Sequence, residues 1–215
     1  MSSINPHYTL EYVQPEEYHF SHDSVFFARK VFEYHAAKLS PTSEVLDLCA
    51  GCGIIGLDFL YHCRKELNLA PKICDFVEVQ KIYESYFTQN VQTFGPTTTQ
   101  IKLIISNYAH LDPQKQRYDL ILCNPPYFRT DQGKLSPSEF KNRCRFFIDS
   151  DFETLLTQTT SLLKPRATAY LLMRDQLAHR QNILQEAQHI LGTQVALNIV
   201  DDVRGTHLVE IKNLG

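Results

Sequence analysis

The feature that most limits the fold of this chain is a regular alternation of short apolar runs with longer stretches of helical periodicity. A short apolar run predicts a buried strand, whereas apolar residues three or four apart predict a helix. We expect strands over residues 45–49, 73–79, 101–105, 120–123, 168–173, 194–200 and 208–212. Helices are expected over residues 23–38, 54–69, 81–94, 151–163 and 176–191. This order is typical of a parallel sheet covered by helices on both faces.

The last two predicted strands lie close together in the sequence, joined by residues 201–206. A short connection of this kind suits a hairpin, so the final strand is expected to run antiparallel. The predicted fold class is therefore α/β, a Rossmann-like, doubly wound and mostly parallel seven-stranded sheet with an antiparallel last strand. We expect a single domain overall, with an N-terminal extension over residues 1–40 and a main domain over 41–215. The extension is expected to hold a short hairpin (residues 8–13 and 18–20) and a helix.

Composition argues against several classes of protein. No apolar run approaches the roughly 18 residues of a membrane span, and residues 1–6 lack the basic and apolar regions of a secretion signal. Four of the six cysteines lie within predicted strands and helices (Cys49, Cys63, Cys74 and Cys123), and the six form no paired framework. The Cys49-x-x-Cys52 pair lacks further ligands at metal-binding spacing. We therefore expect a cytoplasmic protein that binds neither a membrane nor a metal.

The most informative motif is Asn124-Pro125-Pro126-Tyr127, which directly follows the apolar run over residues 118–123. Each proline fixes its own φ at about −65° and keeps the residue before it extended, so the loop is stiff. Stiffness lets the Asn124 side-chain oxygen and the Pro125 carbonyl act as two acceptors aimed at one spot, with the Tyr127 ring beside them. A planar group that carries an NH2, either a nucleobase amine or a carboxamide, fits such a site. We therefore predict that Asn124, Pro125, Pro126 and Tyr127 are catalytic.

A glycine-rich turn, Asp47-Leu-Cys-Ala-Gly-Cys-Gly-Ile-Ile-Gly56, follows the first predicted strand. Glycines at this place let the backbone turn sharply and approach a ligand closely, and the helix that follows favours a negatively charged ligand group at its N-terminus. Glu78, at the end of the second strand, can accept hydrogen bonds from ribose hydroxyls, and Asn107, after the third, can bind an adenine edge. The predicted cofactor-binding residues are Asp47, Cys49, Ala50, Gly51, Gly53, Glu78, Asn107 and Asn124.

A long stretch without apolar periodicity, residues 128–147, follows the Asn-Pro-Pro-Tyr motif. Between residues 129 and 145 it carries five basic side chains against two acidic ones, although the net charge of the chain is −3. Loops of this length are usually functional or disordered, and basic clusters often contact nucleic-acid phosphates, although a solvated charged loop is the plain alternative. We predict that Tyr127, Phe128 and Arg129 bind the substrate, the two rings by stacking on a base.

In their order and spacing, the glycine-rich turn, Glu78, Asn107 and the Asn-Pro-Pro-Tyr motif resemble the class I S-adenosylmethionine-dependent methyltransferases that carry this motif. The resemblance covers about residues 20–212. Residues 18–24, Tyr-His-Phe-Ser-His-Asp-Ser, and Phe128 are most similar to the bacterial tRNA (adenine-N6) methyltransferases that act on a valine tRNA. The resemblance implies S-adenosylmethionine as cofactor, a methyltransferase domain over residues 41–215, adenine N6 as the methylated amine, and tRNA or another structured RNA as partner.

Three positions depart from the pattern of these families. Cys49 stands where the superfamily usually has glycine, and Lys164-Pro-Arg-Ala167 stands where Lys-Pro-Gly-Gly is common. Residues 142–145, Asn-Arg-Cys-Arg, replace an Arg-His-Glu sequence that the tRNA enzymes tend to carry, which bears on the substrate rather than on the methyl donor.

The same sequence features also suit other functions. The same fold and cofactor serve enzymes that methylate a protein glutamine or DNA adenine, although the glutamine enzymes usually have an N-terminal helical domain, and only about 40 residues precede the first strand here. A nicotinamide-dependent oxidoreductase leaves the Asn-Pro-Pro-Tyr motif without a role. A non-catalytic S-adenosylmethionine-binding protein is the alternative from another class.

Overall fold

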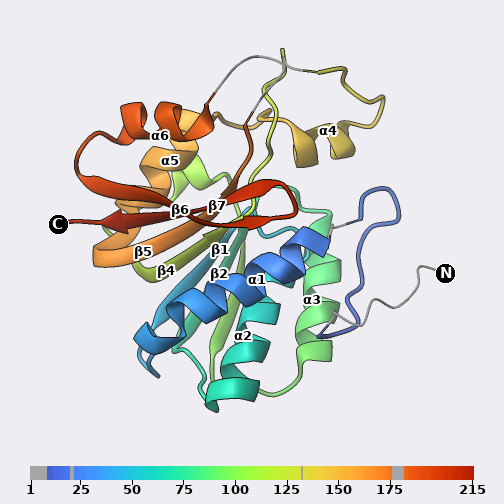
Figure 1. Ribbon diagram of the computed structural model, residues 1–215. Coiled ribbons are helices and arrows are strands. Elements are labelled where there is room, and N and C mark those ends of the chain that lie inside the picture. Colours follow the sequence, from blue (N-terminus) through green and yellow to red (C-terminus); the bar gives the residue numbers. More distant parts are fainter. Residues whose placement is uncertain (1–8, 20–21, 132, 176–181) are drawn as a thin grey trace.

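A computed structural model of the protein describes residues 9–19, 22–131, 133–175 and 182–215. Its centre is a seven-stranded sheet in the order β3-β2-β1-β4-β5-β7-β6 (Figure 1). The strands are β1 (Glu44–Leu48), β2 (Ile73–Glu78), β3 (Gln100–Ile105), β4 (Tyr118–Cys123), β5 (Leu163–Met173), β6 (Val195–Val203) and β7 (Thr206–Asn213). β1 to β5 pair in parallel, and β7 runs antiparallel to both of its neighbours, β5 and β6. The predicted fold class, with its antiparallel last strand, is confirmed.

Helices cover both faces of this sheet (Figure 1). One face carries α1 (His22–His35), α2 (Ile54–Leu67) and α3 (Tyr83–Phe94), and the other carries α5 (Phe152–Ser161) and α6 (Ile183–Leu191). A short helix, α4 (Glu139–Arg145), lies beyond one end of the sheet, and two 3-10 turns, η1 (Ala36–Lys38) and η2 (Tyr108–His110), complete the described elements.

Alternation of side chains along the central strands builds two separate cores, because successive residues of a strand point to opposite faces. On β4, Leu120 and Leu122 belong to the core beneath α1, α2 and α3, whereas Ile121 and Cys123 belong to the core beneath α5 and α6. All four side chains are fully buried. This is why the central strands read as continuous apolar runs in the sequence.

One predicted strand begins earlier in the structure, and part of one predicted helix is not described. The strand predicted from residue 168 begins at Leu163, because a bulge between the β4 partners Tyr118 and Leu120 admits extra residues into β5. Within that bulge Arg166 has a φ of 62°, which interrupts the strand pattern in the sequence. The helix predicted from residue 176 is described from Ile183, and residues 176–181 lie outside the described part of the chain.

The stretch over residues 128–147 contains a helix that the sequence analysis did not predict. α4 begins after Ser138, whose hydroxyl accepts a hydrogen bond from the backbone N–H of Lys141, an N-terminal cap. Only Asn142 is buried in this helix, so it lacks the apolar periodicity on which the prediction relied. The cap at Ser138 followed by Glu139 was the available sign in the sequence.

The predicted N-terminal hairpin is wrong for the described residues 9–13 and 18–19, which contain no strand; Tyr8 and Phe20 lie outside the described part of the chain. Side chains of the helices replace the strand partner. The Asn90 amide of α3 accepts a hydrogen bond from the Val13 N–H at 2.8 Å and donates one to the Val13 carbonyl at 3.0 Å. The Asp58 carboxylate of α2 accepts hydrogen bonds from the hydroxyls of Thr9 and Tyr12.

Burial raises the pKa of the Asp58 carboxyl to about 7, despite the hydrogen bond from Tyr12, which favours the ionised form. The folded protein therefore keeps a proton on Asp58 in the pH range from about 4 to about 7, where the unfolded chain has lost it. The contribution of the Asp58 carboxyl to the free energy of unfolding is fully present below about pH 4 and is lost as the pH rises from about 4 to about 7.

We expect Asp58→Asn to remove this pH dependence, so that the variant gains stability relative to the natural protein as the pH rises from about 4 to about 7. The relative gain should be on the order of 1–4 kcal/mol across the range. Denaturant unfolding at a series of pH values measures it, with Asp131→Asn, a change at an exposed acid, as the control. Parallel stability curves for Asp58→Asn and the natural protein contradict the assignment.

Candidate active site

A cavity of about 290 Å³ opens at the carboxyl ends of β1 and β4, where the strand order reverses direction. This switch point is where open α/β sheets bind ligands, because the loops from adjacent strands diverge there. The register pairs Leu48 of β1 with Cys123 of β4, so the glycine-rich turn and the Asn-Pro-Pro-Tyr loop start side by side. The cavity is lined by Tyr18, His19, Ser24, Ile54, Ile55 and Tyr83, and by residues 49–52, 77–80, 106–108, 124–128 and 143–150.

The glycine-rich turn is shaped by residues with positive φ. Gly51 and Gly53 have φ angles of 54° and 84°, and Gly53 is the N-terminal cap residue of α2. A Cβ atom on Gly53 would lie 2.6 Å from the Phe87 ring, so the position demands glycine for space as well as conformation. Cys49 also has a positive φ, of 61°, a conformation that glycine adopts more easily than any residue with a Cβ atom.

Asp47 supports the turn from beneath. Its side chain is fully buried, and its Oδ2 accepts a hydrogen bond from the backbone N–H of Gly56 at 2.8 Å. Burial raises the pKa of this carboxyl to about 7, and the Gly56 N–H opposes that shift. Asp47 does not line the cavity, so the structure places it behind the glycine-rich turn rather than at the cavity surface.

Glu78 joins the first two loops at the floor of the cavity. One carboxylate oxygen accepts a hydrogen bond from the Gly51 N–H at 2.9 Å, and the other accepts one from the Gln80 N–H at 2.8 Å. Burial raises the pKa of this carboxyl, whereas the backbone N–H groups lower it. The side chain therefore holds the turn in place and lines the cavity at once.

Asn107 also lines the cavity, but both ends of its amide already have partners within the protein. Its Oδ1 accepts a hydrogen bond from the Ala109 N–H at 2.9 Å and thereby caps η2. Its Nδ2 donates a hydrogen bond to the Asp149 carbonyl at 2.6 Å, which ties this wall to the chain that follows α4.

The Asn-Pro-Pro-Tyr loop lines the same cavity from the end of β4. The Tyr127 hydroxyl donates a hydrogen bond to Asn124 Oδ1, and the Tyr127 ring is half-buried against the core beneath α1 and α2. Burial raises the pKa of this hydroxyl, so it remains a donor at physiological pH. The structure therefore turns Tyr127 toward Asn124, where it orients the amide oxygen.

The residues after Tyr127 pair with the chain that leaves α4. The N–H groups of Tyr127 and Phe128 both donate hydrogen bonds to the Arg145 carbonyl, at 3.2 and 3.0 Å, and the Phe147 N–H donates one to the Phe128 carbonyl at 2.8 Å. The long stretch between them therefore folds back on the Asn-Pro-Pro-Tyr loop and forms the far wall of the cavity. Arg129 points elsewhere: it pairs with Glu186 of α6 and does not line this cavity.

Some cavity residues were not predicted as site residues. Gln80, Tyr83 and Cys144 meet across the cavity wall, where the Cys144 Sγ lies 3.3 Å from the Tyr83 Oη and 3.4 Å from the Gln80 Nε2. Tyr18 and His19 line the cavity from the N-terminal segment. Tyr18, His19 and Cys144 lie in stretches that the sequence had marked, residues 18–24 and 128–147, whereas Gln80 and Tyr83 do not.

The described residues hold no group of three or more His, Cys, Asp or Glu side chains placed to bind a metal ion. Over the same residues, no helix has both the length and the apolar character needed to cross a membrane. All six cysteines are free thiols.

Comparison with known proteins points to one family. The sequence model of the family described as "Methyltransferase small domain" matches residues 13–139, more than half of the chain. Among curated proteins, several relatives bear the name tRNA1(Val) (adenine(37)-N6)-methyltransferase. The one from Dyadobacter fermentans is 28% identical over 129 residues, which cover 60% of this chain and 50% of that protein. The one from Pedobacter heparinus is 29% identical over 161 residues, which cover 74% and 64%. The chain thus spans about half to two thirds of the length of these relatives.

Solved structures share the fold. A methylase from Haemophilus influenzae has a TM-score of 0.56 at 20% identity, with 87% of this chain and 88% of that chain covered. TrmN from Thermus thermophilus has a TM-score of 0.59 at 19% identity, with 89% and 49% covered. A magnesium protoporphyrin IX methyltransferase from Synechocystis, solved with bound SAH, has a TM-score of 0.60 at 12% identity, with 86% and 81% covered.

The glycine-rich turn yields a stability prediction. Gly53→Ala should destabilise the protein by about 2–4 kcal/mol, because alanine at this positive φ is strained and its Cβ meets the buried Phe87 ring. Gly95→Ala is the matched control, since Gly95 has a φ of 81° but no atom within 4 Å of an added Cβ. The difference between the two variants in urea unfolding isolates the clash, and equal losses would show that Phe87 moves aside freely.

Proposed function

This chain belongs to the methyltransferase small domain family, and from this premise we propose that it transfers a methyl group from S-adenosylmethionine to adenine N6 in tRNA. The observation that carries the proposal is one shared cavity, bordered on one side by the glycine-rich turn and on the other by Asn124-Pro125-Pro126-Tyr127. A donor site and an acceptor site in one cavity allow direct transfer between bound molecules.

The residues around the cavity fit the proposed cofactor. Gly51 brings backbone without bulk to the ligand, and α2 begins two residues after Cys52, with the positive end of its dipole toward the cavity. Glu78 is placed to accept ribose hydroxyls with the lone pairs that its backbone partners leave free. Ile54, Ile55 and Tyr108 add apolar surface for an adenine ring. When bound, S-adenosylmethionine supplies an electrophilic methyl group on a sulfonium.

The Asn-Pro-Pro-Tyr loop acts on the acceptor. The lone pair of an exocyclic adenine nitrogen is delocalised into the ring, which makes the amine a weak nucleophile. Hydrogen bonds from its two N–H groups to Asn124 Oδ1 and the Pro125 carbonyl favour a pyramidal nitrogen with its lone pair aimed at the methyl group. Preorganised acceptors of this kind stabilise the positive charge that develops on nitrogen. The amine then loses a proton.

Tyr127 orients the Asn124 side chain rather than stacking on the adenine. Its hydroxyl uses one lone pair of Asn124 Oδ1, and a carbonyl oxygen has a second one for the amine. Phe128, whose half-buried ring lines the cavity, is the aromatic residue placed to stack on the acceptor base. Such stacking contributes about 1–3 kcal/mol per base.

The acceptor class rests on the relatives and on local charge. The curated relatives carry the name of a tRNA adenine methyltransferase, and residues 129–145 carry five basic side chains against two acidic ones. Incubation with labelled methyl donor and separate pools of tRNA, rRNA, DNA and protein tests the proposal. We expect label in tRNA; label in protein alone would overturn the RNA assignment, and no label in any pool would favour a binding protein without activity.

Asn124→Ala should lower the turnover number by about 10²–10³-fold, because it removes an acceptor that is needed when charge develops on the amine. The affinity for S-adenosylmethionine should stay within a few-fold of the natural protein. Initial rates of methyl transfer and calorimetry of cofactor binding measure the two effects. Asn198→Ala, an exposed change on β6, is the control, and unchanged turnover in Asn124→Ala would sink the mechanism.

Tyr127→Phe separates the hydroxyl from the ring. The variant keeps the packing of the ring but frees Asn124 Oδ1, so turnover should fall about tenfold, less than in Asn124→Ala. Initial rates at saturating cofactor measure this effect. A loss equal to that of Asn124→Ala would instead indicate that the Tyr127 hydroxyl contacts the acceptor itself.

A further inference from the structure

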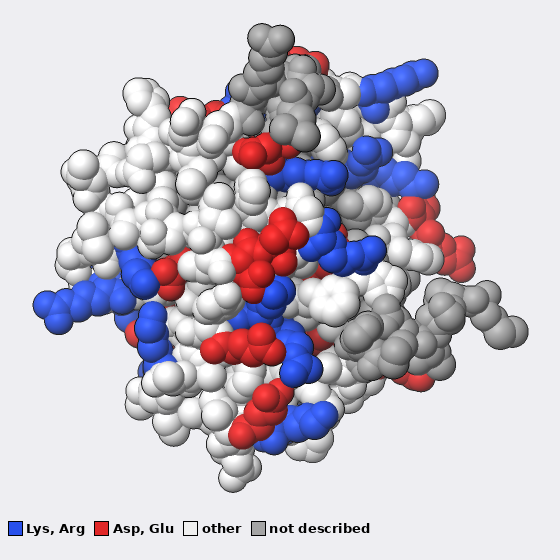
Figure 2. Space-filling view, viewed as in Figure 1, with Lys and Arg blue, Asp and Glu red and all other residues white. Residues whose placement is uncertain are grey.

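Arg145 stands out among the basic residues near the cavity. Arg143 is engaged, since its Nε donates to Asp149 Oδ2 at 2.9 Å, and Arg129 pairs with Glu186. Within the described part of the chain, the exposed guanidinium of Arg145 has no carboxylate partner. Figure 2 shows Lys and Arg side chains gathered over the region of α4.

The Arg145 side chain is supported by two aromatic rings. Its guanidinium carbon lies 5.7 Å from the centroid of the Phe128 ring and 5.8 Å from that of Phe146. The centroids of the Phe128 and Phe146 rings lie 5.7 Å apart, and the Phe146 ring is buried. Guanidinium groups at such distances are attracted by the negative faces of aromatic rings, which leaves their N–H donors free for another partner.

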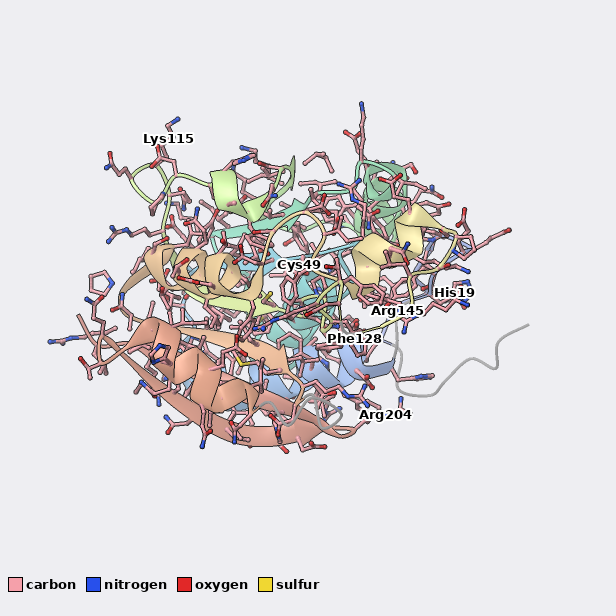
Figure 3. All side chains as sticks on the ribbon, turned by 90° about the horizontal axis from the view of Figure 1, so that it is seen from above. His19, Cys49, Lys115, Phe128, Arg145 and Arg204 are labelled. Atoms are coloured by element: carbon pink, nitrogen blue, oxygen red, sulfur yellow. The ribbon has the colours of Figure 1, made fainter. Side chains whose placement is uncertain are left out.

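The backbone of Arg145 is hydrogen-bonded to the Asn-Pro-Pro-Tyr loop and to Phe128 after it, here called the acceptor loop. Its carbonyl accepts the N–H groups of both Tyr127 and Phe128, so the side chain starts at a fixed distance from the proposed acceptor site. Tyr127 and Phe128 are consecutive residues; the first turns toward Asn124, and the second turns toward Arg145. Figure 3 shows Phe128 and Arg145 beside each other, with Lys115 on the distant side of the molecule.

From this arrangement we infer that Arg145 is a substrate-positioning residue, which binds a backbone phosphate next to the adenine that stacks on Phe128. The inference rests on the proposed function and adds to it a specific contact. Bases of single-stranded RNA stack on aromatic side chains, while the adjoining phosphates are bound by arginine. The guanidinium presents several donors in a plane and suits two phosphate oxygens better than an ammonium does.

The salt dependence of RNA binding distinguishes a phosphate contact from a merely structural role. Each phosphate contact to single-stranded nucleic acid contributes about −0.7 to the slope of log K against log salt concentration. We expect Arg145→Ala to bind an unmodified valine tRNA transcript roughly tenfold more weakly. Its slope of log K against log salt concentration should be shallower by about 0.7. Arg145→Lys, which keeps the charge, should restore the slope and part of the affinity.

The Arg145 carbonyl belongs to the backbone and is retained in both variants, so the acceptor loop keeps its hydrogen bonds. Cofactor affinity, measured by calorimetry, should be unchanged and reports that the cavity is intact. Lys115→Ala, on the distant side, is the control for nonspecific charge loss. If the natural protein methylates the transcript and Arg145→Ala keeps its slope, this inference alone is overturned. If the natural protein neither binds nor methylates RNA, the proposed function is overturned and the inference with it.

Discussion

The parallel pairing of β1 with β4 is the constraint on which the rest of this site depends. Because Leu48 lies opposite Cys123, the two strands end at the same level, and the two loops that follow them border one cavity. Strand order reverses at this pair, with β2 and β3 on one side and β5, β7 and β6 on the other. A slip of one residue in this register would turn every side chain of β4 to the opposite core and would separate the two loops.

Buried polar contacts hold the loops in position once the strands have brought them together. Asp47 and Glu78 each accept one backbone N–H group of the glycine-rich turn. The backbone carbonyl of Arg145 accepts the N–H groups of Tyr127 and Phe128. Burying a carboxyl group has a cost, visible in the raised pKa values of Asp47 and Glu78. The Asp47 contact makes the turn rigid, because its loss would leave the buried Gly56 N–H without a partner.

Two positions that depart from the resembled family pattern share an unusual backbone conformation. Cys49 and Arg166 stand where glycine is common, and they have φ angles of 61° and 62°. Non-glycine residues can adopt this conformation at a cost of roughly 1–2 kcal/mol each, which the rest of the fold must offset. Cys49 leads into the glycine-rich turn, and Arg166 lies in a bulge of β5.

The sequence by itself determined the layered sheet, its antiparallel last strand and the two motifs, because strands buried on both faces and prolines or glycines at their ends leave strong local patterns. It did not determine which way side chains turn. Tyr127 donates a hydrogen bond to Asn124 only because the loop folds back on itself. The contacts of Arg129 with Glu186 and of Arg145 with Phe128 join residues that are far apart in the sequence. Only the tertiary structure could decide these contacts, because α4 carries no apolar periodicity that would reveal its place from the sequence. The same holds for the N-terminal segment, which is held by the side chains of Asp58 and Asn90 rather than by a strand partner.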